Sequence, residues 1–337
     1  MLNDLKQYGR KKLNKKQYGF VEGSSIELCK RDVFKEIKTQ MLTQGNTVEK
    51  RIHVLFVDYS SAYNNIIREK LYQRLEEKQI VSKDKLNLLK FIHQQTKVVI
   101  GDEEVITNKG VPQGNLTSPL LFNIATEDLI EEMQKIDVNI FMYADDTALI
   151  CRNRKELEKG IKVLENWSEE NGLTINKKKS GVMIMSKRKS KGRGLEIDKL
   201  WDYPIVNNYK YLGTVMTKHM SIDSHLNETG QKVDYLTRKL TPFRINASVK
   251  FNVNMFKLMV APQYRLLASL WDFIGKTAKK MITISYRKSF KKFMMMPPSV
   301  PNSVIDLLIG NMDELVGKMK TTIERQQNRA KKAEETA

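Results

Sequence analysis

Two adjacent carboxylates, Asp145 and Asp146, stand at the tip of a segment whose pattern predicts a strand, a tight turn and a second strand. Carboxylates so close together repel each other and are difficult to keep ionised without a cation. A solvated Asp-Asp turn is common, and the pair alone favours that interpretation. Asp58, however, ends a strongly apolar strand, and pairing of these strands would bring all three carboxylates together.

Three converging carboxylates form a set of hard oxygen ligands. Such a set suits two Mg²⁺ ions, with Mn²⁺ as a substitute. Two ions held roughly 4 Å apart can activate an attacking 3′-hydroxyl and stabilise the leaving pyrophosphate during in-line phosphoryl transfer. The chemistry that these residues indicate is therefore that of a nucleic-acid polymerase.

The elements that must position this site follow from the apolar pattern. An apolar run over 52–57 predicts the buried strand that delivers Asp58, and strands over 138–143 and 147–151 flank the acidic turn. The remaining pattern predicts helices over 26–42, 65–78, 83–95, 120–133 and 154–171, a hairpin over 97–107, a strand over 180–185 and a helical region from 231 onward. This order indicates an α+β fold.

The amino-acid composition narrows the classes of molecule that the chain is expected to bind. The chain has 337 residues, with 58 Lys plus Arg against 39 Asp plus Glu, a net charge of +19. The electric field of so positive a chain attracts polyanions, so nucleic acid is the first partner to consider and an anionic membrane surface the weaker one.

Two distant cysteines give no disulfide framework and no metal cluster, and no apolar run is long enough to cross a bilayer. We expect an intracellular protein with no membrane partner, with the nucleus favoured and mitochondrial import left open.

Five segments, in order, resemble the reverse transcriptases of non-LTR retrotransposons and, more distantly, group II intron maturases. The segments are FVDYSSAYNNI (56–66), GVPQGNLTSPLLFNI (110–124), FMYADD (141–146), GLTINKKKS (172–180) and YKYLG (209–213), preceded by QYGF (17–20). The resemblance covers residues from about 15 to 215. It implies an RNA-directed DNA polymerase whose partners are an RNA template, a DNA primer or RNA–DNA hybrid, and a dNTP.

The resemblance also implies a role for each matching residue. Asp58, Asp145 and Asp146 correspond to the catalytic metal ligands. The nucleotide-binding positions are Tyr63, Gln113, Gly114 and Lys179, and the primer grip is Tyr211, Leu212 and Gly213. Each of these roles has a structural alternative: Tyr63 could be core packing, Gln113 could bond only its own loop, and Lys179 could belong to a solvated cationic turn.

Two basic patches are further candidates for nucleic-acid binding. They comprise Lys187, Arg188, Lys189, Lys191 and Arg193, and then Arg287, Lys288, Lys291 and Lys292. Such runs are usually solvated surface. Because Tyr286, Phe290 and Phe293 are interleaved with the second patch, it suits backbone tracking and base stacking.

The resemblance implies a right-hand polymerase with an antiparallel palm sheet, truncated fingers and a helical thumb. We expect partial fingers with a basic helix over 1–50, a palm over 51–230 with a fingers insertion at about 65–107, a thumb-like region over 231–317 and a charged flexible tail over 318–337. Helices should pack on one face of the palm sheet, and nucleic acid should lie across the open face.

Two functions remain in competition at this point. The first is an active RNA-directed DNA polymerase, which the intact acidic triad favours. The second is a domesticated, non-catalytic relative that serves as an RNA-binding subunit of a ribonucleoprotein, which the short segment ahead of residue 17 favours, since relatives carry further fingers segments there.

Overall fold

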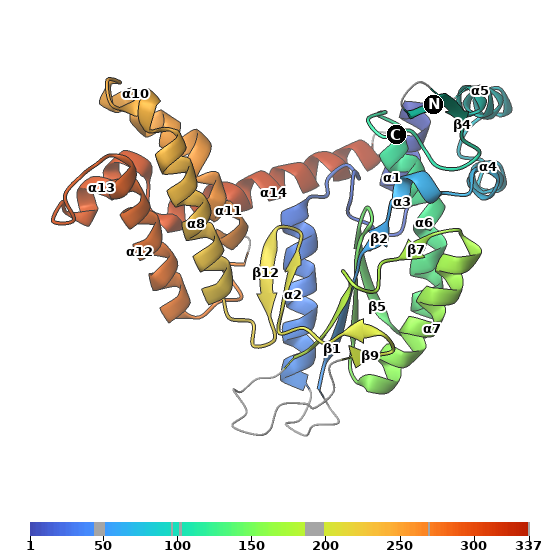
Figure 1. Cartoon of the computed structure of the whole chain (residues 1–337), viewed down its shortest axis with the longest axis horizontal. Helices are drawn as coiled ribbons and strands as arrows, with labels where there is room; N and C mark the ends of the chain where they lie inside the picture. Colours follow the sequence, from blue (N-terminus) through green and yellow to red (C-terminus); the bar gives the residue numbers. More distant parts are fainter. Residues whose placement is uncertain (44–50, 96, 101–102, 186–198, 269, 336–337) are drawn as a thin grey trace.

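The computed structural model describes residues 1–43, 51–95, 97–100, 103–185, 199–268 and 270–335. A four-stranded antiparallel sheet lies at its centre, with the strand order β5-β6-β1-β8 (Figure 1). The strands are β1 (His53–Val57), β5 (Asn139–Tyr143), β6 (Asp146–Cys151) and β8 (Gly181–Ile184). Helices combined with an antiparallel sheet confirm the predicted α+β class.

One face of this sheet packs against helices. These are α1 (Leu2–Lys11), α4 (Arg68–Glu77), α5 (Lys83–Gln94), α6 (Ser118–Lys135) and α7 (Arg154–Glu170). Leu55 and Val57 of β1 are buried among the apolar residues of these helices in the largest core of the chain. Burial of apolar surface is the main favourable term in folding, so this core holds the strands rigidly in place.

The opposite face of the sheet is covered as well. It packs against α2 (Ile26–Thr43) and against the hairpin of β11 (Asn208–Tyr211) and β12 (Thr214–Thr217). Val54, Phe56 and Phe141 are at most 1 % exposed there. The expected open sheet face is therefore wrong. The physical reason lies in β1, whose five residues are all buried, because a strand with apolar side chains on both faces needs cover on both.

Three short ladders complete the strand pairing in the described residues. They join β2 (Tyr59–Ser60) to β7 (Thr174–Ile175), β3 (Lys97–Ile100) to β4 (Glu103–Ile106) and β9 (Lys199–Leu200) to β10 (Tyr203–Pro204). The first of them continues directly from β1 and so lies beside the predicted site.

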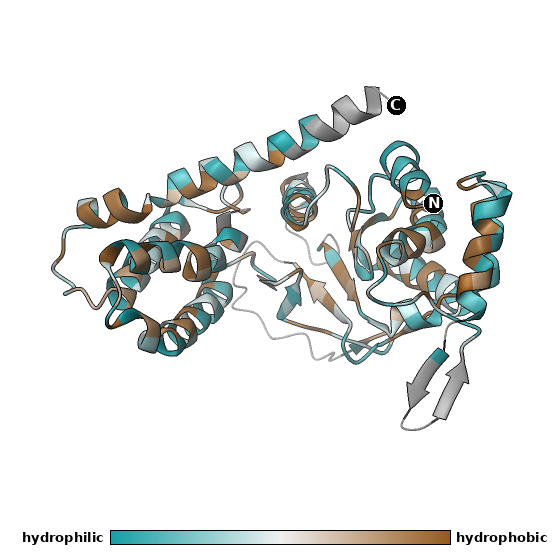
Figure 2. Ribbon diagram, turned by 90° about the horizontal axis from the view of Figure 1, so that it is seen from above, coloured by the Kyte–Doolittle hydropathy of each residue, from teal (hydrophilic) through white to brown (hydrophobic). Residues whose placement is uncertain are grey.

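A C-terminal helical region, residues 223–335, has a core of its own. It consists of α8 (Asp223–Lys239), α9 (Thr241–Arg244), α10 (Val249–Met255), the π-helical turn η2 (Phe256–Val260), α11 (Pro262–Ala268), α12 (Lys276–Phe293), α13 (Asn302–Ile309) and α14 (Met312–Glu335). The long helix α14 leaves this region and runs back across the molecule to contact α1 (Figures 1 and 2).

Three element boundaries differ from the predicted ones. The helix predicted over 65–78 is divided into α3 (Ala62–Asn65) and α4, because Ile66 and Ile67 between them pair with a distant loop: the Gly110 N–H donates to the Ile66 carbonyl at 2.8 Å. The helical region begins at Asp223 rather than at 231. The predicted flexible tail is helical to Glu335, since it consists mostly of strong helix formers without proline or glycine.

In the part of the chain that the structure describes, no helix is both long enough and apolar enough to span a membrane.

The N-terminus of α7 offers a test of the fold. The Asn153 Oδ1 accepts a hydrogen bond from the Glu156 N–H at 3.0 Å and so caps the helix. We expect Asn153→Ala to lower the free energy of unfolding by about 1 kcal/mol in urea titrations. The exposed Lys159→Ala on the same helix should change it by no more than about 0.5 kcal/mol. Equal effects of the two variants would contradict the capping role.

Candidate active site

The sheet register brings the three predicted carboxylates to one end of the central sheet. Val57 of β1 pairs with Thr147 of β6, so the next position along the antiparallel ladder sets Asp58 opposite Asp146. Asp145 lies in the two-residue turn between β5 and β6, whose flanking residues Tyr143 and Asp146 are paired. The convergence expected from the sequence therefore follows from strand pairing.

The electrostatics of these carboxylates show that they lie within range of one another. Burial, followed by the neighbouring charges of Asp145 and Asp58, raises the pKa of Asp146 to about 6. Burial and the charge of Asp58 also raise the pKa of Asp145. Asp146 keeps an exposed side, so an incoming cation has access to it. The site holds negative charge that its own residues do not neutralise.

A metal ion would relieve this repulsion. Within the described residues, no three His, Cys, Asp or Glu side chains are arranged to hold a metal ion by themselves. Mg²⁺ in phosphoryl-transfer sites characteristically takes one or two carboxylates and completes its shell with substrate phosphates and water. The donor type and the mutual repulsion of the carboxylates fit such partial ligation.

The backbone of Asp58 is held by the segment before β8. The Asp58 N–H donates to the Ser180 Oγ at 3.0 Å, and the Ser180 hydroxyl donates to the Asn176 carbonyl at 2.9 Å. The Asn176 N–H in turn donates to the Asp58 carbonyl at 2.8 Å. Both residues were missed at the level of sequence because only Lys179 was taken from this segment, on the basis of the family resemblance. A small polar residue at the start of an apolar strand was the available signal.

Tyr63 lies on α3 beside the carboxylates. Its ring stacks on that of Phe122 with centroids 4.7 Å apart, and burial together with the charge of Asp145 raises the pKa of its hydroxyl to about 12. The ring is only partly buried. The ring therefore packs on α6 and lies close enough to Asp145 to feel its charge.

The loop that carries Gln113 and Gly114 is anchored next to Tyr63. The Val111 N–H donates to the Tyr63 carbonyl at 2.9 Å. At Gly110, which has φ of +79°, an added Cβ would lie 2.7 Å from the Asn64 backbone, so this close approach requires glycine. Gln113 and Gly114 are exposed on the loop. They are available to a ligand at this side of the site.

The three lysines of the 177–179 turn have different surroundings. The Lys177 Nζ pairs with the Glu165 carboxylate at 2.8 Å. Lys178 and Lys179 are exposed. The Lys179 carbonyl accepts a hydrogen bond from the Tyr209 hydroxyl at 3.2 Å, which links this turn to β11.

The hairpin β11-β12 reaches the site with a different residue from the one predicted. Tyr211 is 2 % exposed, with its hydroxyl 3.7 Å from the Cys29 Sγ of α2, so it anchors the hairpin and does not face solvent. Leu212 and Gly213 form the partly exposed turn. Tyr209 instead stacks on Phe56 at 4.5 Å, and burial with the charges of the nearby carboxylates raises its pKa to about 12.

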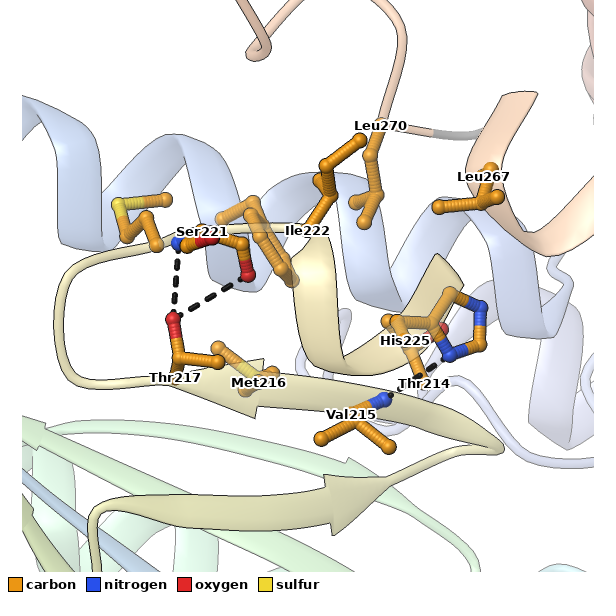
Figure 3. A pocket seen from close by; sticks show the side chains of 11 residues that line it. Thr214, Val215, Met216, Thr217, Ser221, Ile222, His225, Leu267 and Leu270 are labelled. Carbon is orange, nitrogen blue, oxygen red and sulfur yellow. Dashed lines mark hydrogen bonds between the residues drawn. The ribbon is translucent and has the colours of Figure 1, made fainter. Parts of the chain in front are cut away.

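The junction between this hairpin and the C-terminal helical region encloses a small cavity (Figure 3). His225 of α8 lines it, and the His225 Nδ1 accepts a hydrogen bond from the Val215 N–H at 3.3 Å. Burial lowers the pKa of His225 to about 4, so the ring is neutral at physiological pH. The cavity is lined mainly by apolar side chains and belongs to the packing between the two regions.

The second basic patch is not the stacking surface that was predicted. Tyr286, Phe290 and Phe293 are at most 1 % exposed and form the core of the helical region. Arg287 makes paired hydrogen bonds to the Asp306 carboxylate, and Lys292 pairs with Asp234. Helical spacing placed the aromatic rings on the inner face. Lys288 is exposed, and the Lys291 Nζ donates to the Pro298 carbonyl.

The first basic patch lies outside the described residues. Its members are Lys187, Arg188, Lys189, Lys191 and Arg193.

A protein-family model described as "Reverse transcriptase (RNA-dependent DNA polymerase)" matches residues 1–216. This range contains all three carboxylates and the segments that resemble the non-LTR enzymes.

Among curated proteins, the chain is similar to two from Drosophila melanogaster. It is 24 % identical over 204 residues to the RNA-directed DNA polymerase from mobile element jockey, covering 56 % of this chain and 22 % of the relative. It is 23 % identical over 234 residues to a putative 115 kDa protein in type-1 retrotransposable element R1DM, covering 64 % of this chain and 21 % of that protein. The chain thus spans about a fifth of the length of these relatives.

Among solved structures, the chain resembles apo telomerase from Candida tropicalis. The TM-score is 0.50 with 13 % sequence identity, and the match covers 98 % of this chain and 58 % of that one. At this identity the likeness concerns the fold alone.

The raised pKa of Asp146 yields a prediction about stability. The folded carboxyl holds its proton to about pH 6, whereas an unfolded aspartate titrates near pH 4, so the charged group costs stability at neutral pH and the cost vanishes as pH falls through this window. We therefore expect Asp146→Asn to raise the free energy of unfolding of the metal-free chain at about pH 7.5, with a smaller gain as pH approaches 4.

Urea titrations in the presence of EDTA measure this effect. The control is Asp137→Asn, whose carboxylate is 82 % exposed and remote from the triad. Lower stability of Asp146→Asn at neutral pH would show that the carboxylates do not repel one another as described.

Proposed function

Because this chain belongs to the reverse transcriptase family, we propose that it is an RNA-directed DNA polymerase that adds deoxynucleotides to a primer 3′-hydroxyl. The observation that carries the proposal is the convergence of Asp58, Asp145 and Asp146, which the pairing of β1 with β6 produces. A protein that only coats nucleic acid has no use for three repelling carboxylates at the end of a sheet.

In this proposal the central sheet with α6 and α7 is the palm, and the C-terminal helical region is the thumb. Residues 1–50 and the insertion at about 65–107 contribute the fingers. The fold likeness to telomerase over nearly the whole chain supports a right-hand arrangement.

Asp58, Asp145 and Asp146 are the proposed ligands of two Mg²⁺ ions. When bound, such ions lower the pKa of the primer hydroxyl and neutralise charge on the departing pyrophosphate. The chain itself contributes rigid placement. The Asp58 backbone is fixed through Ser180, and the Asp146 backbone is part of β6.

The nucleotide would be received between α3 and the Gly110 loop. Tyr63 borders the carboxylates with a ring held by stacking on Phe122, which suits a steric barrier against a ribose 2′-hydroxyl. Gln113 and Gly114 are exposed beside it and are assigned to the base and the template. Lys179 is assigned to the phosphates because it is exposed on the turn that also carries the Asp58 contacts.

The turn of the hairpin β11-β12 is the proposed primer grip. In this proposal the partly exposed Leu212 and Gly213 touch the primer strand, and the buried Tyr211 supports them from within. The template–primer duplex is then held through phosphates and sugars by the basic surface of the chain.

Primer extension tests the proposed activity. We expect the full chain with Mg²⁺ to extend a DNA primer on an RNA template, and we expect Asp145→Asn combined with Asp146→Asn to abolish extension, because both changes remove charged metal ligands. Asp137→Asn, an exposed carboxylate outside the site, serves as the matched control and should retain activity.

Binding of the RNA–DNA hybrid is measured in parallel. If the wild-type chain and the double variant both bind the hybrid and neither extends the primer, the polymerase proposal fails and a non-catalytic RNA-binding role takes its place.

The proposed contacts to phosphates also predict that the affinity for nucleic acid depends on the salt concentration. Since release of counterions accompanies such contacts, we expect the affinity for an RNA–DNA hybrid to fall steeply, with little dependence on base sequence, as salt rises from about 50 to 200 mM. Fluorescence anisotropy with two hybrids of unrelated sequence measures both features. An affinity that is insensitive to salt would contradict the proposed mode of binding.

A further inference from the structure

The turn that carries Asp145 is held by a buried side chain from a distant part of the chain. The Gln17 Oε1 accepts a hydrogen bond from the Ala144 N–H at 2.9 Å and another from the Gly19 N–H at 3.1 Å. The Gln17 Nε2 donates to the Ala144 carbonyl at 3.4 Å. Gln17 is 3 % exposed, so its side chain is buried against the turn and not solvated.

Ala144 needs such a partner for two reasons. It has φ of +54°, in the left-handed region that costs energy for a residue with a Cβ and persists only when its surroundings hold it. It is also 4 % exposed, and as a turn residue its N–H and carbonyl lie outside the ladder of β5 and β6. Without Gln17 both groups would be buried and unpaired, which is costly.

The segment that presents Gln17 is itself fixed on both sides. Along one side it pairs with β5: the Tyr18 N–H donates to the Met142 carbonyl at 2.8 Å, and the Met142 N–H donates to the Lys16 carbonyl at 2.9 Å. On the other side, the Asn123 Nδ2 of α6 donates to the Gly19 carbonyl at 2.6 Å, and Asn123 is fully buried.

Gly19 shows how closely the segment approaches the turn. A Cβ at this position would lie 2.3 Å from the Ala144 nitrogen, which no side chain could tolerate. The contact is therefore backbone against backbone, with the Gln17 amide filling the space between. A connected set of buried polar groups runs from α6 through Gly19 and Gln17 to the acidic turn.

We propose that Gln17 is a positioning residue that fixes the Ala144-Asp145 turn, and with it the placement of Asp145 and Asp146 as metal ligands. The inference rests on the proposed function for its catalytic consequence, although the clamp itself is a matter of geometry. A residue that orients metal ligands without touching the metal typically changes affinity or activity by about 10- to 100-fold when it is replaced.

Two substitutions separate positioning from simple stability. Gln17→Met keeps the length and volume of the side chain and removes all three hydrogen bonds. Gln17→Glu keeps an oxygen that can accept from both N–H groups. It replaces the Nε2 donor with an oxygen, which can donate to the Ala144 carbonyl only while the carboxyl is protonated. Gln40→Met is the matched control, because Gln40 is likewise a buried glutamine, 6 % exposed, whose Nε2 donates to Glu36 on α2 far from the turn.

Three measurements on the full chain test whether Gln17 positions the acidic turn. For Gln17→Met we expect faster deuterium exchange at the Ala144 amide, an affinity for Mn²⁺ by paramagnetic resonance that is about 10-fold weaker, and a kcat for primer extension about 10- to 100-fold lower, with KM for the dNTP changed less than about threefold. Gln17→Glu should restore part of the kcat relative to Gln17→Met, because it keeps the two bonds from the Ala144 and Gly19 N–H groups. Gln40→Met should leave all three quantities within about twofold, even where its melting temperature falls equally.

The outcomes that overturn the inference are distinct from failure of the proposed function. Unchanged exchange at Ala144 in Gln17→Met, or equal effects of Gln17→Met and Gln40→Met on Mn²⁺ affinity and kcat, would reduce Gln17 to an ordinary part of the fold. If the wild-type chain extends no primer while exchange at Ala144 and Mn²⁺ affinity still depend on Gln17, the polymerase proposal fails and the clamp stands.

Discussion

The antiparallel register of β1 on β6 is the constraint on which the rest of the site depends. It sets Asp58 opposite Asp146, and a slip of one residue would turn every side chain of β1 to the other face of the sheet. Such a slip is prevented from both sides, because Leu55 is buried in one core and Phe56 in the other. The placement of Asp58 opposite Asp146 is thus a consequence of packing on both faces of the central sheet.

Two energetically unfavourable features lie at this same site. Asp146 carries a charge that its neighbours oppose, and Ala144 adopts a backbone conformation that alanine disfavours. Both features sit where buried polar groups hold the chain, with Ser180 on the Asp58 side and Gln17 on the turn. A strained backbone and a pair of like charges persist at a site only when the surrounding structure holds them in place. Here the surrounding structure is a set of hydrogen-bonded polar groups.

The local sequence pattern was sufficient to predict the strands that carry the carboxylates. It was insufficient to predict the contacts between residues that are distant in the sequence. Apolar runs that end at Asp58 and flank the acidic turn predicted the strands and their convergence, because the signal lies in consecutive residues. The division at Ile66 escaped prediction because a loop more than 40 residues away supplies its hydrogen bond. Gln17 bonds a turn 127 residues away, so nothing near it in the sequence reveals its role. The rings at 286, 290 and 293 were misassigned because the basic residues between them outweighed their helical spacing, which indicates one inner face.

The course of α14 has a mechanical consequence. Within the described residues, the C-terminal helical region is attached to the sheet-bearing part in three places. These are the contact of α8 with β12, the packing of Leu270 and Phe273 with residues of α2, and the contact of α14 with α1. A rigid body attached at one point can swing in any direction, whereas each further attachment removes part of that freedom. The three attachments therefore restrain the helical region against the central sheet, and a large change in their relative position requires at least one of these contacts to break.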